Sequence, residues 1–385
     1  MHLIHIADSH LGRTAFQKTT EDGSNLREAL IYENFLAGIE RIIEVAPDVL
    51  IHAGDLFDTV KPKTKALLVA MQALDMLDEN HIPFIAIAGN HSMPKNAYTT
   101  SAFEILKKAH PEIYAAYSFK YEHVKIGDTH FHLIPNMLHA ADYKTAAFDA
   151  ESYGPRAYPK DQHVLITHGL ATTIRDKRLA TCAEFELTPE ILAESYDYIA
   201  LGHYHGQQQI APNAWYSGSQ EHLTYGEIKD KKGALEVWID GGVTTVDHFS
   251  LVRSPMRDLG TVDCNGLLVA GILDRIQDEI GLVDGIGDQM YQITLDFGSS
   301  PVKALPTDAL KDLRESILDL KIRVRSEEIE RQQVQQRDLR AINYVEEFGT
   351  FLQGRQMNEA DRILVEAKGT QVLKDVMAEH AEATE

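Results

Sequence analysis

The sequence opens with the stretch HLIHIADSHLG at residues 2–12, in which an apolar run ends abruptly in polar side chains. A short run of this kind, with β-branched residues, is typical of a buried strand. Asp8 and His10 follow the run directly. We therefore expect a strand at residues 2–7 that leads into a loop carrying potential metal ligands.

The pattern of a short apolar run followed by a polar loop recurs four times. The further runs lie at residues 48–53, 83–88, 163–167 and 198–201. Helical patterns at 26–45 and 65–79 separate the first three runs. This alternation predicts an α/β fold, in which the loops at the carboxyl ends of the strands meet in one crevice.

Side chains that can bind a metal ion gather at these strand ends, and 15 of the 18 histidines lie at or before residue 205. The candidate ligands are Asp8, His10, Asp55, Asn90, His168, His203 and His205. Carboxylates, imidazoles and one amide, without sulfur, favour manganese, iron or zinc over calcium or magnesium. Seven ligands are too many for one ion, but with one bridging carboxylate they make two half-sites of four ligands. Alternate residues of an extended segment point to the same side, so Asp8 and His10 are expected to converge, as are His203 and His205.

The chain is acidic, with 37 Lys and Arg residues against 58 Asp and Glu residues and a formal net charge of −21. This balance disfavours non-specific binding of a polyanion by the whole surface. Two divalent ions beside two carboxylates would nevertheless leave the site positive, and a positive site attracts a phosphodiester. Any nucleic acid is therefore expected to bind locally.

Length and composition exclude several other classes. A chain of 385 residues with 44% hydrophobic residues is sufficient for two or three folded domains, which excludes disordered and fibrous proteins. The two cysteines, Cys182 and Cys264, predict neither a disulfide framework nor a thiolate zinc site. No membrane-spanning run or signal peptide is recognisable, so we expect a soluble, cytoplasmic protein without a membrane partner.

The second half of the sequence changes character twice. Runs at 234–239 and 244–251, joined by the turn signal Asp240-Gly241-Gly242, predict a hairpin that completes the second sheet of the first domain. Strands and helices then alternate as in a small α+β domain, and from residue 326 the chain is helix-forming and charged. We thus expect three parts, at residues 1–251, 252–325 and 326–385.

The last part contains an amphipathic stripe at helical spacing. Its residues are Ile342, Val345, Phe348, Phe351 and Leu352. Such a stripe packs either on the chain's own core or on a partner, and the pattern alone favours neither.

Five short motifs occur in the order found in one superfamily of hydrolases. They are Asp8-x-His10, Gly54-Asp55-x-x-Asp58, Gly89-Asn90-His91, His168-Gly169 and Gly202-His203-x-His205. In these motifs the chain resembles the calcineurin-like metallophosphoesterases. Over residues 1–325 it is similar to the SbcD nuclease family, called meiotic recombination eleven in archaea and eukaryotes. The resemblance implies two packed mixed sheets flanked by helices, a small α+β capping domain that positions duplex DNA, and a helical C-terminal tail that binds an SbcC-type ABC ATPase.

The resemblance also implies a role for each site residue. Asp8, His10, Asp55 and His205 would hold one Mn²⁺ ion, and Asp55, Asn90, His168 and His203 the other, with Asp55 as the bridge. His91 would be the catalytic acid, protonating the leaving alkoxide or orienting the phosphate. The family's motif continues with Asp after this histidine, whereas this chain has Ser92, so an expected carboxylate near the site is missing.

Three neighbouring features have two interpretations each. Asp58 either caps its loop or takes part in the site. His52 lies inside a strand and is expected to be a core histidine rather than a ligand. The lysines at 61–65 either form a solvated turn or contact the DNA backbone.

The sequence thus predicts a manganese-dependent DNA nuclease with two Mn²⁺ ions per subunit. By resemblance it would act on DNA ends as a 3′–5′ exonuclease on duplexes and as an endonuclease on single strands, in double-strand break repair, as a homodimer. The alternative is another dimetal phosphoesterase, such as a nucleotidase or a cyclic-nucleotide phosphodiesterase, because fold and metals alone do not choose a substrate. A protein phosphatase is disfavoured, since Thr59-Val60 replaces the Arg-Gly of that class. A mainly non-enzymatic scaffold, based on the C-terminal helices, is the other alternative.

Overall fold

The computed structural model describes most of the chain. The described residues are 1–94, 96, 99–174, 186–188, 191–192, 195–281, 289–298, 305–306, 308–326, 352, 362 and 364–372. The chain divides into two compact units, of which the first comprises 1–260, 276–293 and 307–322 and the second 261–275, 294–306 and 323–385. The expected division into parts at 1–251, 252–325 and 326–385 stays a prediction.

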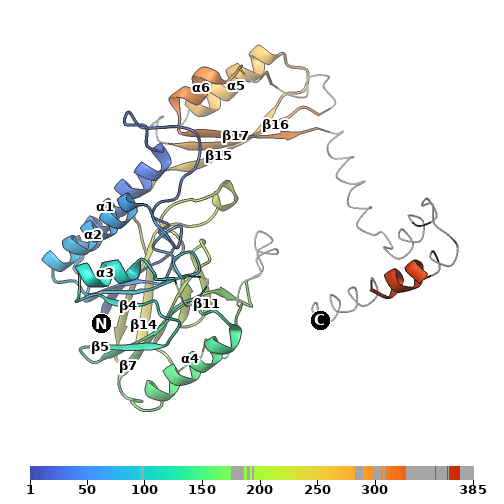
Figure 1. The fold of residues 1–385 in the computed structure, drawn as a ribbon. Helices are drawn as coiled ribbons and strands as arrows, with labels where there is room; N and C mark the ends of the chain where they lie inside the picture. Colours follow the sequence, from blue (N-terminus) through green and yellow to red (C-terminus); the bar gives the residue numbers. More distant parts are fainter. Residues whose placement is uncertain are drawn as a thin grey trace. The chain divides into compact units, whose positions relative to one another are not determined.

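Two six-stranded mixed sheets form the centre of the first unit (Figure 1). The first sheet consists, in spatial order, of β14 (Val243–Phe249), β13 (Ala234–Asp240), β1 (His2–Ile6), β2 (Val49–His52), β3 (Phe84–Ile87) and β4 (Tyr114–Ala116). The strands β1 to β4 run parallel, and β13 and β14 extend the sheet antiparallel beyond β1.

The second sheet has parallel strands inside and an antiparallel strand at each edge, whereas the first has antiparallel strands at one edge only. Its spatial order is β11 (Gln208–Ala211), β12 (Ala214–Tyr216), β10 (Tyr198–Gly202), β7 (Gln162–His168), β6 (Thr129–Ile134) and β5 (Glu122–Ile126). A separate pair, β8 (Leu170–Ala171) and β9 (Glu186–Leu187), follows β7 in the chain.

The alternation of side chains along the strands explains the layers. On β1, Leu3 packs between the two sheets with Phe131 of β6, whereas Ile4 packs on the outer face near Phe35. The helices α1 (Leu26–Glu44), α2 (Thr64–Glu79) and α3 (Phe103–Ala109) cover this outer face, and α4 (Ala140–Tyr153) covers the outer face of the second sheet (Figure 1). The predicted α/β fold of two packed mixed sheets flanked by helices is confirmed.

The hairpin predicted around residue 241 exists, but its sheet was predicted wrongly. Gly241 and Gly242 have φ angles of 55° and 78°, which is the left-handed geometry that a two-residue hairpin turn requires. The hairpin pairs with β1 in the first sheet, with His2 opposite Trp238, and does not complete the second. The open edge of β1 accepts β13, whose Leu235 and Val237 then pack between the sheets.

Strands and helices alternate after residue 255, as expected. The elements are β15 (Met256–Asp263), α5 (Val269–Gly281), β16 (Met290–Asp296), α6 (Lys311–Ser316) and β17 (Asp319–Arg325). The three strands form one sheet in the order β15-β16-β17. Of the predicted C-terminal stripe, Ile342, Val345, Phe348 and Phe351 lie outside the described residues, and Leu352 is buried. Among the described residues, no helix combines the length and apolarity needed to cross a membrane.

Candidate metal centre

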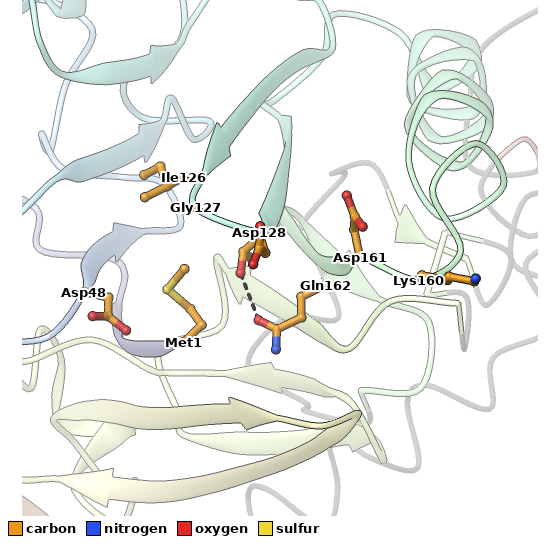
Figure 2. Close-up of a pocket in the computed structure, with 9 residues that line it drawn as sticks. Met1, Asp48, Ile126, Gly127, Asp128, Lys160, Asp161 and Gln162 are labelled. Atoms are coloured by element: carbon orange, nitrogen blue, oxygen red, sulfur yellow. Dashed lines mark hydrogen bonds between the residues drawn. The ribbon is translucent and has the colours of Figure 1, made fainter.

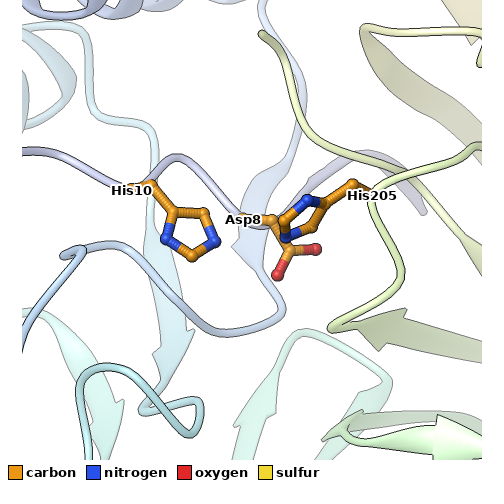
Figure 3. Close-up of side chains that lie close together, drawn as sticks. All are labelled: Asp8, His10 and His205. Carbon is orange, nitrogen blue, oxygen red and sulfur yellow. The ribbon is translucent and has the colours of Figure 1, made fainter. Parts of the chain in front are cut away.

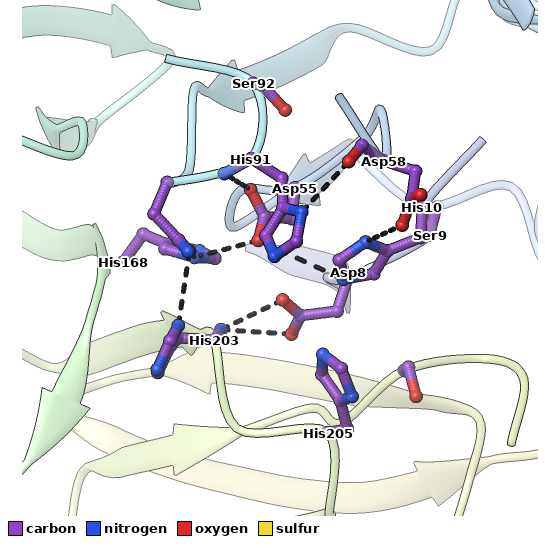
Figure 4. A network of polar contacts seen from close by, with 12 residues as sticks. Asp8, Ser9, His10, Asp55, Asp58, His91, Ser92, His168, His203 and His205 are labelled. Atoms are coloured by element: carbon purple, nitrogen blue, oxygen red, sulfur yellow. Dashed lines mark hydrogen bonds and ion pairs between the residues drawn. The ribbon is translucent and has the colours of Figure 1, made fainter. Parts of the chain in front are cut away.

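The candidate ligands lie where strands of both sheets end (Figure 4). Asp8, Asp55 and Asn90 follow β1, β2 and β3 of the first sheet, His168 ends β7, and His203 and His205 follow β10. His10 lies two residues beyond Asp8. All seven predicted ligands are therefore brought together by carboxyl ends of strands that are distant in sequence.

Four of these residues have a positive φ angle, a backbone conformation that residues other than glycine rarely adopt. The φ angles are 54° at Asp8, 48° at His10, 54° at Asp55 and 103° at His203. Each such residue costs about 1–3 kcal/mol and is typical of functional sites. Asp8 and His10 thus converge through left-handed turns, and the expectation that an extended segment aligns them was wrong. Backbone hydrogen bonds from Asp8 to Gly54 and from His10 to Asp55, both 3.0 Å, hold these turns.

Asp8, His10 and His205 form one group, because their ligand atoms lie within 4.8 Å of one another (Figure 3). Asp8 and His10 are each 1% exposed, and among the residues that the structure describes Nε2 of His10 has no hydrogen-bond partner. A buried polar atom without a partner costs about 1–3 kcal/mol, a cost that a bound cation would remove. The backbone N–H of His203 donates to both carboxylate oxygens of Asp8 at 3.0 Å and so fixes that carboxylate.

His168 lies at the centre of a second group and is fully buried. Its Nδ1 atom donates to the carbonyl oxygen of Ala53 at 2.9 Å, and its Nε2 atom lies 2.8 Å from Oδ1 of Asn90 and 3.3 Å from Oδ2 of Asp55. An unprotonated Nε2 would face these oxygens lone pair to lone pair, so this position needs a proton or a metal cation. Burial lowers the pKa of His168, but the Asp55 carboxylate outweighs it and raises the pKa to about 9. His203 joins the group, with Nδ1 3.2 Å from Oδ1 of Asn90.

Asp55 lies between the two groups, a position that suits a bridging carboxylate. Its ligand atom groups with those of Asp8 and His168, and also with those of His10 and His91. Burial opposes ionisation of Asp55, but His168 and His10 hold its pKa below the usual range, so the carboxylate is charged. The donors are nitrogen and oxygen only, and they fit two divalent ions of the manganese, iron or zinc class.

His91 lies beside this centre and is exposed. Its backbone N–H donates to Oδ1 of Asp55 at 2.8 Å, and its Nδ1 donates to the carbonyl oxygen of Asp58 at 2.9 Å. The Nε2 atom is thus the one that can carry a transferable proton. Ser92 is buried, and its hydroxyl bonds the backbone of Phe57 at 3.3 and 3.4 Å. This serine ties two site loops together in the position where the family has a carboxylate.

Carboxylates outside the ligand set hold two of the site histidines. Asp58 accepts a hydrogen bond from Nδ1 of His10 at 3.0 Å and one from Arg13 at 3.3 Å, so it belongs to the site. Glu227 accepts from Nδ1 of His205 at 3.1 Å. Burial opposes ionisation of Glu227, but His205 and Lys232 hold its pKa far below the usual range.

The sequence analysis missed Glu227 and Lys232. Glu227 ends the 3₁₀ helix η2 (Tyr225–Glu227), 22 positions after His205, and no local pattern distinguishes it from the other acidic residues. Lys232 is 1% exposed, which no scale of hydrophobicity anticipates for a lysine. Only the folded loop between β12 and β13 brings the pair to the site.

The two other ambiguous features do not contribute ligands. His52 is fully buried, bonds Ser9 through Nε2 at 2.9 Å, and has a pKa lowered to about 3 by burial, as expected of a core histidine. In the lysine run, Lys63 pairs with Glu28 of α1 at 2.6 Å while its side chain is 57% exposed.

Gly202 permits the close approach of the two sheets at the site. A Cβ atom there would lie 2.0 Å from the carbonyl oxygen of Ala53, the same oxygen that holds His168. We expect Gly202→Ala to lower the free energy of unfolding by about 1–3 kcal/mol, measured by urea denaturation, because the backbone must move. The control is Gly271→Ala in α5, where the nearest atom lies at 3.9 Å. Unchanged stability in Gly202→Ala would show that the loops adapt at no cost.

A separate pocket of about 640 Å³ lies at the opposite ends of the strands, away from the candidate metal centre (Figure 2). Its lining includes Met1, which precedes β1, Asp48, which precedes β2, and Gln162, which begins β7. These are the amino ends of strands whose carboxyl ends carry the ligands. The pocket is therefore not part of the candidate metal centre.

The chain is similar to known proteins over much of its length. The family described as calcineurin-like phosphoesterase matches residues 1–207. The DNA double-strand break repair protein Mre11 of Methanococcus maripaludis is 30% identical over 238 residues, or 60% of each chain. The protein of the same name from Methanopyrus kandleri is 28% identical over 325 residues, or 78% of this chain and 66% of the relative. This chain thus spans less than two thirds of the length of these relatives.

A solved structure of a dimetal phosphatase from Danio rerio aligns with a TM-score of 0.38 and 9% identity, covering 65% of this chain and 97% of that one. The archaeal relatives confirm the resemblance to the SbcD or meiotic recombination eleven family that the motifs indicated. With five motifs at the ends of the strands and a family match over more than half of its residues, this chain belongs to the calcineurin-like phosphoesterase family.

Proposed function

We propose that this protein is a manganese-dependent DNA nuclease that processes the ends of double-strand breaks. The observation that carries the proposal is the convergence of nitrogen and oxygen donors on one buried centre, in a chain whose relatives are named for double-strand break repair. One ion would be held by Asp8, His10, Asp55 and His205, and the other by Asp55, Asn90, His168 and His203. When bound, two such ions activate a water molecule and stabilise the charge of an in-line displacement at phosphorus.

The residues around the centre have separate tasks in this proposal. His91 protonates the leaving oxygen through Nε2, because Nδ1 is held by the carbonyl of Asp58. It is exposed, whereas Asp8 and Asp55 are buried, so it lies on the side of the centre that a substrate can reach. Arg13 and Asp58 orient His10. Two divalent ions with two carboxylates give the centre a net positive charge in an otherwise acidic chain, which favours a phosphodiester.

The proposal is tested with labelled DNA and Mn²⁺. We expect the protein to release the nucleotide of a 3′-labelled duplex early and to shorten a 5′-labelled duplex gradually, which is the behaviour of a 3′–5′ exonuclease. Circular single-stranded DNA, which has no ends, should be cut if the protein is also an endonuclease. His168→Ala provides the inactive control.

A nucleoside monophosphate and a cyclic nucleotide serve as competing substrates in the same assay. Hydrolysis of either one without cleavage of DNA would contradict the nuclease and favour a nucleotidase or a cyclic-nucleotide phosphodiesterase. Chelation with EDTA should stop all activity, and Mn²⁺ should restore it.

We further propose that the protein works as a cytoplasmic homodimer with an SbcC-type ABC ATPase, with residues 252–325 positioning duplex DNA and residues 326–385 binding the ATPase. The family resemblance and the relatives named for DNA repair support this assembly. Removal of residues 326–385 should abolish co-purification with the ATPase and keep Mn²⁺-dependent cleavage. Retained co-purification would place the contact elsewhere.

A further inference from the structure

The histidines of the centre differ in what holds their Nδ1 atoms. His10 and His205 both donate to carboxylates, Asp58 and Glu227, at 3.0 and 3.1 Å. His168 donates instead to the carbonyl oxygen of Ala53, and Nδ1 of His203 lies 3.2 Å from the amide oxygen of Asn90. His10 and His205 also belong to the same group, the one they form with Asp8. Carboxylate support is thus found on both histidines of one half-site.

The support of His205 is a buried network around Glu227. Oε1 of Glu227 accepts from His205 and from Thr224, the latter at 3.0 Å, and Oε2 accepts from Lys232 at 2.7 Å. The Lys232 ammonium group also donates to the carbonyl oxygen of His205 at 2.7 Å and to Ser219 at 2.9 Å. The three donors of the ammonium group therefore have three acceptors. Both the ring and the backbone of His205 are held by this one ion pair.

We propose that Glu227, paired with Lys232, is a positioning residue that makes the Asp8–His10–His205 half-site the tighter of the two and the first to fill. A carboxylate on Nδ1 places the proton there, directs the lone pair of Nε2 at the ion and makes the imidazole a stronger ligand. A neutral carbonyl oxygen on Nδ1 fixes the same tautomer but adds no charge. The inference rests on the proposed dimetal function and deepens it.

The experiment is a Mn²⁺ titration of the full chain, in which free Mn²⁺ is measured by electron paramagnetic resonance. We expect two binding steps in the wild type. Glu227→Gln should weaken the tighter step by about 10- to 100-fold, the usual effect of losing such a partner, and leave the weaker step unchanged.

The matched control is Glu221→Gln. Glu221 is 3% exposed, comes from the same loop and pairs with the buried Arg27 at 2.8 Å. Within the described part of the chain, the hydrogen bonds of its carboxylate go to Arg27, Asn34 and Ser254 and to no candidate ligand. We expect both binding steps to be unchanged in this variant. If Glu221→Gln and Glu227→Gln lose Mn²⁺ affinity equally, Glu227 has only a structural role and the proposal is overturned. The same holds if Glu227→Gln loses affinity equally in both binding steps.

The remaining outcomes separate this proposal from the one on which it rests. A wild type that binds no Mn²⁺ overturns the dimetal function and this inference with it. Two normal steps in both the wild type and Glu227→Gln overturn only the inference. If Glu227→Gln does not fold because Lys232 is left unpaired, Glu227→Gln/Lys232→Met removes both charges and takes its place in the titration.

Independently, nitrogen-15 spectra of histidine in the metal-free wild type should show the proton of His205 on Nδ1, and a proton on Nε2 alone would overturn the proposal.

Discussion

Replacing Asp55 with asparagine is expected to lower Mn²⁺-dependent turnover by at least about 1,000-fold, which corresponds to about 4 kcal/mol of transition-state stabilisation. Asp55 groups with His10 of one proposed half-site and with His168 of the other, and it is the carboxylate that the motifs assign as the bridge. The amide of asparagine has the same shape and can still accept the hydrogen bond from the backbone of His91. The variant therefore removes the charge that two cations would share while it keeps the loop.

The measurement is the rate of cleavage of labelled duplex DNA over a range of Mn²⁺ concentrations. Asp48→Asn is the control, because Asp48 lies at the opposite end of β2, where Oδ2 accepts from the backbone of His2 at 2.7 Å. We expect that variant to keep its turnover. Circular dichroism should show that both variants are folded. Wild-type turnover in folded Asp55→Asn would mean that Asp55 does not bridge two ions.

Local periodicity predicted the strands and helices that build the site. It could not predict which distant strands pair with one another. The strands expected at 2–7 and 163–167 are observed as β1 and β7. The hairpin of β13 and β14 was placed in the wrong sheet, because its apolar residues pack between the two sheets from either one. A strand's own residues determine which face is buried, and the partner's free edge determines which sheet it joins.

The motifs named the candidate ligands, which the fold brings together, but they did not predict how these side chains are held. The left-handed backbone of Asp8 and His10 depends on hydrogen bonds to the loop after β2, which only the folded chain supplies. Glu227 and Lys232 are distant in sequence from the motif that they support. The charge partner of a histidine can come from any loop that packs on it, so no spacing rule identifies it.

Nine of the 15 histidines at or before residue 205 belong to two groups. Five lie in the candidate metal centre. Four others, His123, His130, His132 and His163, form a cluster on β5, β6 and β7. There Nε2 of His123 lies 2.9 Å from Nδ1 of His130, and Nε2 of His132 lies 3.1 Å from Nδ1 of His163. An abundance of imidazole therefore indicates polar contacts as well as metal ligands.

Replacing His91 with alanine is expected to lower the rate of DNA cleavage by about 100- to 10,000-fold, the usual contribution of a general acid, while both Mn²⁺ binding steps remain. The reason is the fixed direction of the ring. Nδ1 donates to the carbonyl oxygen of Asp58, so the ring acts as an acid in its imidazolium form and gives up the proton of Nε2. The methyl group of alanine has no proton to give, but the backbone N–H still donates to Asp55.

A substrate with a better leaving group shows whether His91 acts by protonating the leaving group. The p-nitrophenolate ion leaves without protonation, so the defect of His91→Ala should be much smaller on a p-nitrophenyl phosphodiester than on DNA. An equal defect on both substrates would mean that His91 orients the phosphate rather than protonating the leaving group. Loss of a Mn²⁺ binding step would instead make His91 a ligand, as its place in one group with His10 and Asp55 allows. The assignment of His91 as the acid therefore depends on two results together, retained metal and a defect that follows the basicity of the leaving group.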